Sequence, residues 1–119
     1  MAKKILLVDD DKTILEAVYI LLTGEGYSVR VMSDGKLIEN EIEKEVPNLI
    51  LLDYRLPGKD GWLITKELKR NKATKSIPII MVSADNTVKK VAKDVGVDAF
   101  LAKPFDIDNL VKLVKHHIR

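Results

Sequence analysis

The stretch KILLVDDDKT, residues 4 to 13, runs four apolar residues into three adjacent aspartates. A short apolar run of this kind, bounded by polar residues, is a candidate for a buried strand. Adjacent carboxylates raise one another's pKa values unless something positive lies among them. The stretch therefore predicts a strand that ends at a polar site.

Four further apolar runs follow along the chain, and segments with helical periodicity separate them. The five candidate strands cover residues 4–9, 27–32, 48–53, 77–83 and 98–102. The last helical segment carries an apolar stripe with the spacing of one face of a 3.6-residue helix. Its members are Ile107, Leu110, Val111, Val114 and Ile118.

The residues at the expected ends of the helices agree with this division. Asp11 and Asp106 are of a type that caps helix N-termini, and Gly26 and Gly96 lie where helices should stop. Strands that alternate with helices need crossover connections, which are right-handed and give parallel pairing. The sequence therefore predicts an α/β fold, a doubly wound five-stranded parallel sheet with five helices, as one domain over residues 1–119.

Composition narrows the classes of function. The chain has 20 Lys and Arg against 18 Asp and Glu, a net charge of +2 with the signs interspersed, and no cysteine. The charge balance favours neither nucleic acid nor a membrane surface as a partner. Neither a disulfide framework nor a thiolate metal site can form without cysteine. We expect a soluble, cytoplasmic protein.

Polar residues stand at the carboxyl ends of four predicted strands. They are Asp9 and Asp10, Asp53, Ser83, and Lys103 just past the fifth strand. In open α/β sheets the polar site forms outside these strand ends. A hard divalent cation such as Mg²⁺ prefers oxygen ligands and would relieve the repulsion among the three carboxylates. Each residue alone has an ordinary structural interpretation, as a cap or a turn residue, but their placement on one edge favours a site.

Four motifs in order resemble the receiver domain of bacterial two-component response regulators over essentially the whole chain. They are LLVDD, LILLDYRLPGKDG, IIMVSA and AFLAKPF. Asp53 and Ser83 also lie 30 residues apart (83 − 53), as in that family. The ending AKPFDIDNL is similar to the single-domain relay receivers of sporulation phosphorelays.

The resemblance implies a flavodoxin-like sheet of order 2-1-3-4-5, as in the chemotaxis receiver that the same fold class includes. It further implies that Asp53 accepts a phosphoryl group from a histidine kinase or a histidine phosphotransfer protein. Mg²⁺ would be held by Asp9, Asp10, Asp53 and the backbone carbonyl of Arg55. Such a protein is a signalling phosphoacceptor, not a conventional enzyme, and acts on a downstream effector protein or relays the phosphate.

Three side chains would respond to the phosphoryl group under this resemblance. Lys103 would pair with its oxygens and Ser83 would donate a hydrogen bond to another. Phe100 would turn inward as Ser83 moves, which would remodel the face made by the fourth helix, fifth strand and fifth helix. Two departures from the commoner pattern are Ser83 in place of Thr and Phe100 in place of Tyr.

Three finer expectations concern the docking of the phosphodonor, the peptide bond before Pro104 and the access of water to the site. On the first helix, Ile14 faces the sheet and Leu15 lies at the border of the apolar stripe, and both would meet a helix of the phosphodonor. The bond before Pro104 is expected to be cis, because a tight turn there would aim Lys103 across the strand ends. Arg55 and Asp85 would pair as a partial lid over the site.

Two other classes of function fit part of the sequence. DDDKT also reads as D-x-D-x-T, the motif of haloacid-dehalogenase-like phosphatases, with Asp9 as nucleophile and Asp11 as general acid. Those enzymes need a further acidic metal motif after the lysine, but only 16 residues follow Lys103 and they read as one helix. The third alternative is a receiver-like scaffold that is never phosphorylated.

Overall fold

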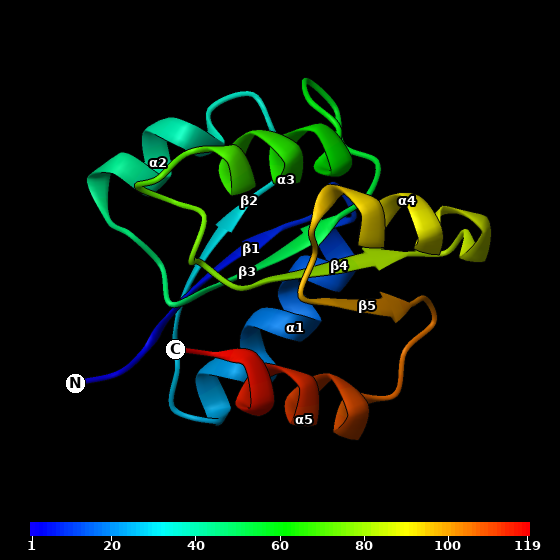
Figure 1. Ribbon diagram of the computed structural model, residues 1–119. Helices are drawn as coiled ribbons and strands as arrows, with labels where there is room; N and C mark the ends of the chain where they lie inside the picture. The colour runs from blue at the N-terminus through cyan, green and yellow to red at the C-terminus, as the bar shows by residue number, and fades with distance from the viewer.

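All five predicted strands form in the structure, a computed structural model that describes residues 1–119 (Figure 1). They are β1 (Lys4–Val8), β2 (Ser28–Met32), β3 (Leu49–Asp53), β4 (Ile79–Ser83) and β5 (Ala99–Ala102). All neighbours pair in parallel, and the strand order is β2-β1-β3-β4-β5. The expected order 2-1-3-4-5 is therefore confirmed.

Helices cover both faces of the sheet, as a doubly wound fold requires. They are α1 (Lys12–Gly24), α2 (Ile38–Lys44), α3 (Gly61–Arg70), α4 (Lys89–Val95) and α5 (Ile107–His117), with a short 3₁₀ turn, η1 (Asn86–Val88), before α4. Figure 1 shows α1 and α5 on one side of the sheet and α2 and α3 on the other. None of these helices combines the length and the apolar character needed to cross a membrane.

The apolar runs exist because the central strands are buried on both faces. Along β1, Ile5 and Leu7 belong to the core beneath α1 and α5, whereas Leu6 and Val8 belong to the core beneath α2 and α3. Alternate side chains of a strand point to opposite faces, so a strand between two helical layers is apolar at every position. The chain changes to aspartate only where β1 leaves this core.

A third and much smaller core lies beneath α4. It contains four buried residues, Tyr54, Met81, Val88 and Ala92. Trp62, Val97 and Phe100 pack against it and remain partly exposed. Ala92 is the one buried residue of α4, so this helix buries the fewest side chains of the five.

Helix ends follow the expected chemistry. A carboxylate oxygen of Asp11 accepts hydrogen bonds from the amides of Thr13 at 2.9 Å and Ile14 at 3.3 Å. Asp106 caps α5 in the same way, and Gly96, with φ of 101°, ends α4 in the left-handed conformation that favours glycine. The two predicted N-caps and the glycine stop of α4 are confirmed.

The first helix is rotated relative to the expected stripe. Leu15, Val18 and Leu22 are its buried residues, whereas Ile14 is half-buried and lines a groove toward α5. The expectation that Leu15 lies at the border of the stripe is wrong. The physical reason is that α1 packs against both the sheet and α5, so its apolar arc is wider than a single stripe and its centre cannot be located from spacing alone.

A lysine joins three elements at the edge of the sheet opposite the aspartates. The Lys69 Nζ at the end of α3 donates to the carbonyl oxygen of Ile77 and to the carboxylate of Asp98, each at 2.9 Å. The same carboxylate accepts the Ile79 amide at 2.8 Å. This contact ties α3 to the starts of β4 and β5.

Candidate functional site

The polar residues that end the strands do converge on one edge of the sheet. Asp9 and Asp10 follow β1, Asp53 ends β3, Ser83 ends β4 and Lys103 follows β5. Parallel pairing brings the carboxyl ends of all these strands to the same edge. The order of the sheet places β1, β3 and β4 next to one another, and therefore sets their terminal side chains side by side.

Three carboxylates form a compact cluster at this edge. Asp9, Asp10 and Asp53 each offer one oxygen, and these oxygens all lie within 4.8 Å of one another. Asp9 is buried, Asp53 is half-buried and Asp10 is exposed, so the cluster opens to solvent on one side. A set of carboxylate oxygens with an open side is the donor chemistry of a Mg²⁺ site, since this ion keeps several of its waters. The residues present therefore fit a magnesium ion.

The lysine after β5 lies between two of the carboxylates. Lys103 Nζ donates to Asp9 at 2.9 Å and to Asp53 at 3.2 Å. The Lys103 side chain is only 16% exposed, so these ion pairs are largely shielded from water. The expected cis bond between Lys103 and Pro104 is present. The lysine thus supplies the positive charge that adjacent carboxylates require.

The surroundings of Asp53 oppose the ionisation of its carboxyl group. Burial, followed by the negative charge of Asp9, raises the pKa of Asp53 from 3.8 to about 6, although Lys103 acts in the other direction. Burial is the largest single influence on Lys103 and opposes its charge, but the hydrogen bonds and negative charges of Asp9 and Asp53 together outweigh burial and raise the pKa of Lys103. One more positive charge at this edge would therefore be bound favourably.

Ser83 and Phe100 occupy the positions from which a switch would operate. Ser83 is buried at the end of β4, and its Oγ accepts a hydrogen bond from the Asp85 amide at 3.0 Å. The Phe100 ring is partly buried against the small core beneath α4. Their roles after phosphorylation remain predictions.

The proposed lid is absent from the structure. The Asp85 carboxylate accepts hydrogen bonds from the amide and hydroxyl of Thr87, at 2.9 and 2.6 Å, and caps η1. The Arg55 guanidinium lies over the Tyr54 ring, 5.5 Å from its centroid. Arg55 adds to the lowering of the pKa of Asp85, after the hydrogen bonds of Thr87, but the two side chains form no ion pair. The expectation failed because each side chain has a nearer partner.

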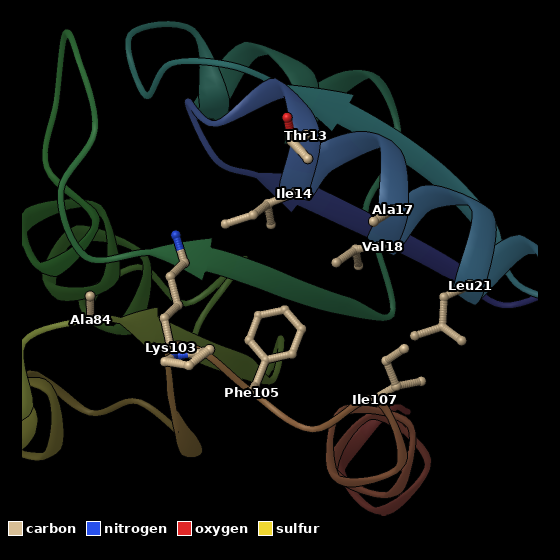
Figure 2. A pocket seen from close by; sticks show the side chains of 10 residues that line it. Thr13, Ile14, Ala17, Val18, Leu21, Ala84, Lys103, Phe105 and Ile107 are labelled. Carbon is tan, nitrogen blue, oxygen red and sulfur yellow. The ribbon is translucent and has the colours of Figure 1, made fainter.

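An apolar groove beside the cluster runs between α1 and α5 (Figure 2). Its volume is about 450 Å³, and Ile14, Leu21, Phe105 and Ile107 are among its lining residues. Ile107 is 59% exposed, although the sequence placed it on the apolar stripe of α5. The stripe therefore extends beyond the core into this groove, and Lys103 lies at one end of it.

A glycine that the sequence analysis missed fixes the loop after Asp53. A Cβ atom on Gly61 would lie 2.0 Å from the carbonyl oxygen of Asp53, a distance that no side chain allows. The Gly61 amide also donates to the Tyr54 carbonyl oxygen at 2.8 Å. The signal was present in the sequence PGKDG, but spacing alone does not show which glycine meets the backbone.

The fold and the cluster define a doubly wound α/β domain with an acidic, magnesium-type site at the carboxyl edge of its sheet. Comparison with known families assigns residues 5–115 to the response regulator receiver domain. The chain therefore belongs to that family, whose members are signalling phosphoacceptors.

Solved structures of the same fold cover nearly the whole chain. A response regulator from Chloroflexus aurantiacus is 35% identical, with a TM-score of 0.93, over 98% of this chain and 97% of its own. The chemotaxis response regulator CheY4 of Vibrio cholerae is 28% identical, with a TM-score of 0.91, over 99% and 100%. The receiver domain of sensor histidine kinase PA1611 from Pseudomonas aeruginosa is 28% identical, with a TM-score of 0.89, over 98% of each chain. That structure has a magnesium ion coordinated in its active site cleft.

These findings decide between two of the three functions. The phosphatase alternative is wrong, because the family match spans residues 5–115 and the Asp11 carboxylate is bound to the amides of α1 as a cap. Asp53, which that alternative leaves without a role, belongs to the cluster and accepts a hydrogen bond from Lys103. The receiver function is the one that the family and the site support.

Proposed function

We propose that Asp53 accepts a phosphoryl group from a phosphohistidine of a histidine kinase or a phosphotransfer protein. The observation that carries this proposal is the lysine between the carboxylates. Lys103 reaches Asp53 and Asp9 at once, and therefore holds a positive charge beside the nucleophile while leaving one side of the cluster open. Positioning and charge neutralisation are the main demands of phosphoryl transfer.

In this step an oxygen of the Asp53 carboxylate attacks phosphorus and forms an acyl phosphate. The bond from phosphorus to the histidine nitrogen breaks, and the imidazole keeps the electron pair. Lys103 would pair with one phosphoryl oxygen, and the Ser83 hydroxyl would donate to another. Because the phosphoryl group brings extra negative charge to Asp53, the Lys103 ammonium has more to neutralise after the transfer than before it.

The residues that would hold Mg²⁺ are Asp9, Asp10 and Asp53, with the backbone carbonyl of Arg55 as a fourth ligand from the protein. The ion would supply positive charge for the phosphoryl oxygens, which the exposed side of the cluster otherwise lacks. The Arg55 ligand rests on the family resemblance. The three carboxylates rest on the distances between their oxygens.

Docking of the donor belongs to the same proposal. Ile14 lies on α1 at the end nearest the cluster and lines the apolar groove toward α5. A helix of the donor that packs there would bring its phosphohistidine to Asp53. Leu15 does not line this groove; it packs in the core beneath α1 and also lines a separate pocket with Lys12 and Tyr19, and its part in docking stays a prediction.

Output would follow from Ser83 and Phe100. Ser83 would give up its hydrogen bond to the Asp85 amide as it turns toward the phosphoryl group. Phe100 would then move inward against the small core beneath α4 and change the face made by α4, β5 and α5. An effector protein that reads this face, or a second phosphotransfer step, would carry the signal onward. Action as one domain over residues 1–119 in the cytoplasm is part of the proposal.

The deciding experiment is incubation with Mg²⁺ and acetyl phosphate, followed by the mass of the intact protein. We expect a gain of one phosphoryl group in the wild type and none in Asp53→Asn. Phosphorylation that persists in Asp53→Asn would place the acceptor elsewhere. A wild type that gains nothing under conditions where Mg²⁺ binds would favour the scaffold alternative.

A further inference from the structure

The loop from β3 to α3, residues 54–60, folds back on the acceptor strand. The Leu56 amide donates to the Asp60 carboxylate at 3.2 Å, and the Lys59 amide donates to the Pro57 carbonyl at 2.9 Å. These bonds close the loop locally, but they attach it to no helix apart from its own continuation into α3. The loop begins directly after Asp53 and carries the Arg55 carbonyl, so its position sets one wall of the site.

One side chain attaches this loop to both neighbouring helices. Lys59 Nζ forms ion pairs with Glu67 of α3 and with Glu39 of α2, the latter at 3.5 Å. The Lys59 side chain is 26% exposed, and no other residue of the loop forms an ion pair. The hydrogen bond with Glu67 raises the pKa of Lys59 and lowers that of Glu67, so both are charged at neutral pH.

A second contact joins the loop to the connection between β2 and α2. A Cβ atom on Gly35, in the connection from β2 to α2, would lie 2.3 Å from the Lys59 carbonyl oxygen and 2.6 Å from Ile64 Cδ1. The Gly35 amide donates to the Pro57 carbonyl at 3.1 Å. A Cβ atom on Gly58, whose φ is 79°, would lie 3.1 Å from the Cβ atom of Lys36. The two connections are therefore in direct backbone contact where Lys59 leaves the loop.

We propose that Lys59 is a positioning residue for the metal site, which holds the loop bearing the Arg55 carbonyl against α2 and α3. This inference rests on the proposed function, since it concerns the loop that would supply the fourth protein ligand to Mg²⁺. Removing Lys59 also leaves Glu39 and Glu67 facing each other without a cation. The loop would then lose its side-chain ties to both helices and keep the backbone contact of Pro57 with Gly35. It would sample positions in which the Arg55 carbonyl is turned away from the ion.

The experiment compares Lys59→Met with the wild type by two measurements on the amide NMR spectrum. In metal-free protein, we expect the amides of residues 56 and 61 to exchange with solvent about five-fold faster in Lys59→Met, because their opening becomes easier. In a Mg²⁺ titration, we expect the dissociation constant to rise about five-fold, the size of effect that a partly exposed ion pair can supply.

Three further variants separate positioning from loss of charge or of folding. Lys59→Arg keeps both ion pairs and should retain the wild-type affinity for Mg²⁺. Lys115→Met removes another lysine with a glutamate partner, Glu25 at 3.3 Å, far along the chain on α5 and should change neither measurement. If Lys59→Met does not fold, the double variant Glu39→Gln with Glu67→Gln releases the loop from the other side and should weaken Mg²⁺ binding similarly.

The outcomes distinguish this inference from the proposed function. If the wild type binds Mg²⁺ and gains phosphate while Lys59→Met matches it in affinity and exchange, Lys59 has no positioning role and the proposed function stands. If Lys59→Arg is as weak as Lys59→Met, the two ion pairs are not the cause and the inference is overturned. If the wild type itself neither binds Mg²⁺ nor gains phosphate, the proposed function fails and this inference fails with it.

Discussion

At the scale of the residue, Asp53 is held where its ionised form is unfavourable. Burial and the charge of Asp9 raise its pKa to about 6 despite the nearby Lys103 ammonium. The native protein therefore binds a proton at Asp53 more tightly than the unfolded chain does. Stability from this proton is fully present below the unfolded value of 3.8 and is lost as the pH rises through about 6.

This titration gives the first prediction. Without Mg²⁺, the free energy of unfolding of the wild type should fall, relative to Asp53→Asn, as the pH rises from 3.8 to about 6. Added Mg²⁺ should restore stability at neutral pH, because it binds the folded cluster and not the unfolded chain. Urea denaturation at a series of pH values measures both effects. An identical pH dependence in wild type and Asp53→Asn would contradict the assignment.

Leu15 and Ile14 of α1 give the second prediction, since Leu15 belongs to the core and Ile14 is half-buried in the wall of the groove. Leu15→Ala should lower the free energy of unfolding by about 2–3 kcal/mol, because it opens a cavity in the core beneath α1. Ile14→Ala should cost less stability, since Ile14 is half-buried, but should slow phosphoryl transfer from the cognate phosphohistidine protein about five-fold. Transfer from acetyl phosphate should be unchanged in Ile14→Ala. Equal slowing with both donors would remove Ile14 from the docking surface.

At the scale of the element, the packing of α3 depends on contacts at both of its ends. Gly61 sets its start against Asp53, and Lys69 ties its end to β4 and β5. We predict that Lys69→Met lowers the free energy of unfolding by about 2 kcal/mol, because it leaves the Ile77 carbonyl without this donor. The affinity for Mg²⁺ should not change, since Lys69 lies at the opposite edge of the sheet. Denaturation and a Mg²⁺ titration on the same variant test both parts, and a large loss of affinity would show that the two edges are coupled.

The elements themselves could be predicted from the sequence because their signals are local. Apolar runs identify the strands, and Asp11 and Asp106 provide capping oxygens within three residues of the helix start. Which side of α1 turns toward the core could not be predicted, because this depends on where α5 lies. Leu15 and Ile14 are equally apolar, and only the packing of the two helices decides which one enters the core.

The residues that form the site could be predicted from the sequence, but the pairing of side chains around it could not. Asp9, Asp53 and Lys103 lie at strand ends, and a parallel sheet brings such ends together whatever the details of packing. The pairing of Arg55 with Asp85 depends on side-chain competition, and Thr87 and Tyr54 were the closer partners. Lys59 was not singled out, because its partners come from two different helices and no spacing in the sequence relates them.

At the scale of the whole molecule, the three cores differ in how many residues they bury. The cores beneath α1 and α5 and beneath α2 and α3 contain 12 and 11 buried residues, whereas the core beneath α4 contains four. A change at the site should therefore spread toward α4, where rearrangement disrupts the fewest contacts.

This asymmetry gives the last prediction. Beryllofluoride, which mimics a phosphoryl group on a carboxylate, should shift amide signals at Asp53 and Ser83 and also across residues 86–112. The shifts in α1 and α2 beyond their first turns should be small. Shifts confined to the strand ends would show that the chain relays phosphate without a change in its α4 face.

The close contact between the connections at Gly35 and Gly58 also bears on how this sequence can evolve. Alanine at Gly35 must push the Lys59 carbonyl away, and once the two connections have separated, a side chain at Gly58 no longer meets Lys36 closely. The steric parts of the two costs should therefore be less than additive, whereas the strain of φ at 79° persists at Gly58 in either background. In a library of paired substitutions, this would appear as positive epistasis between two positions that are far apart in the chain. Lineages that have lost the first glycine would be freer to lose the second.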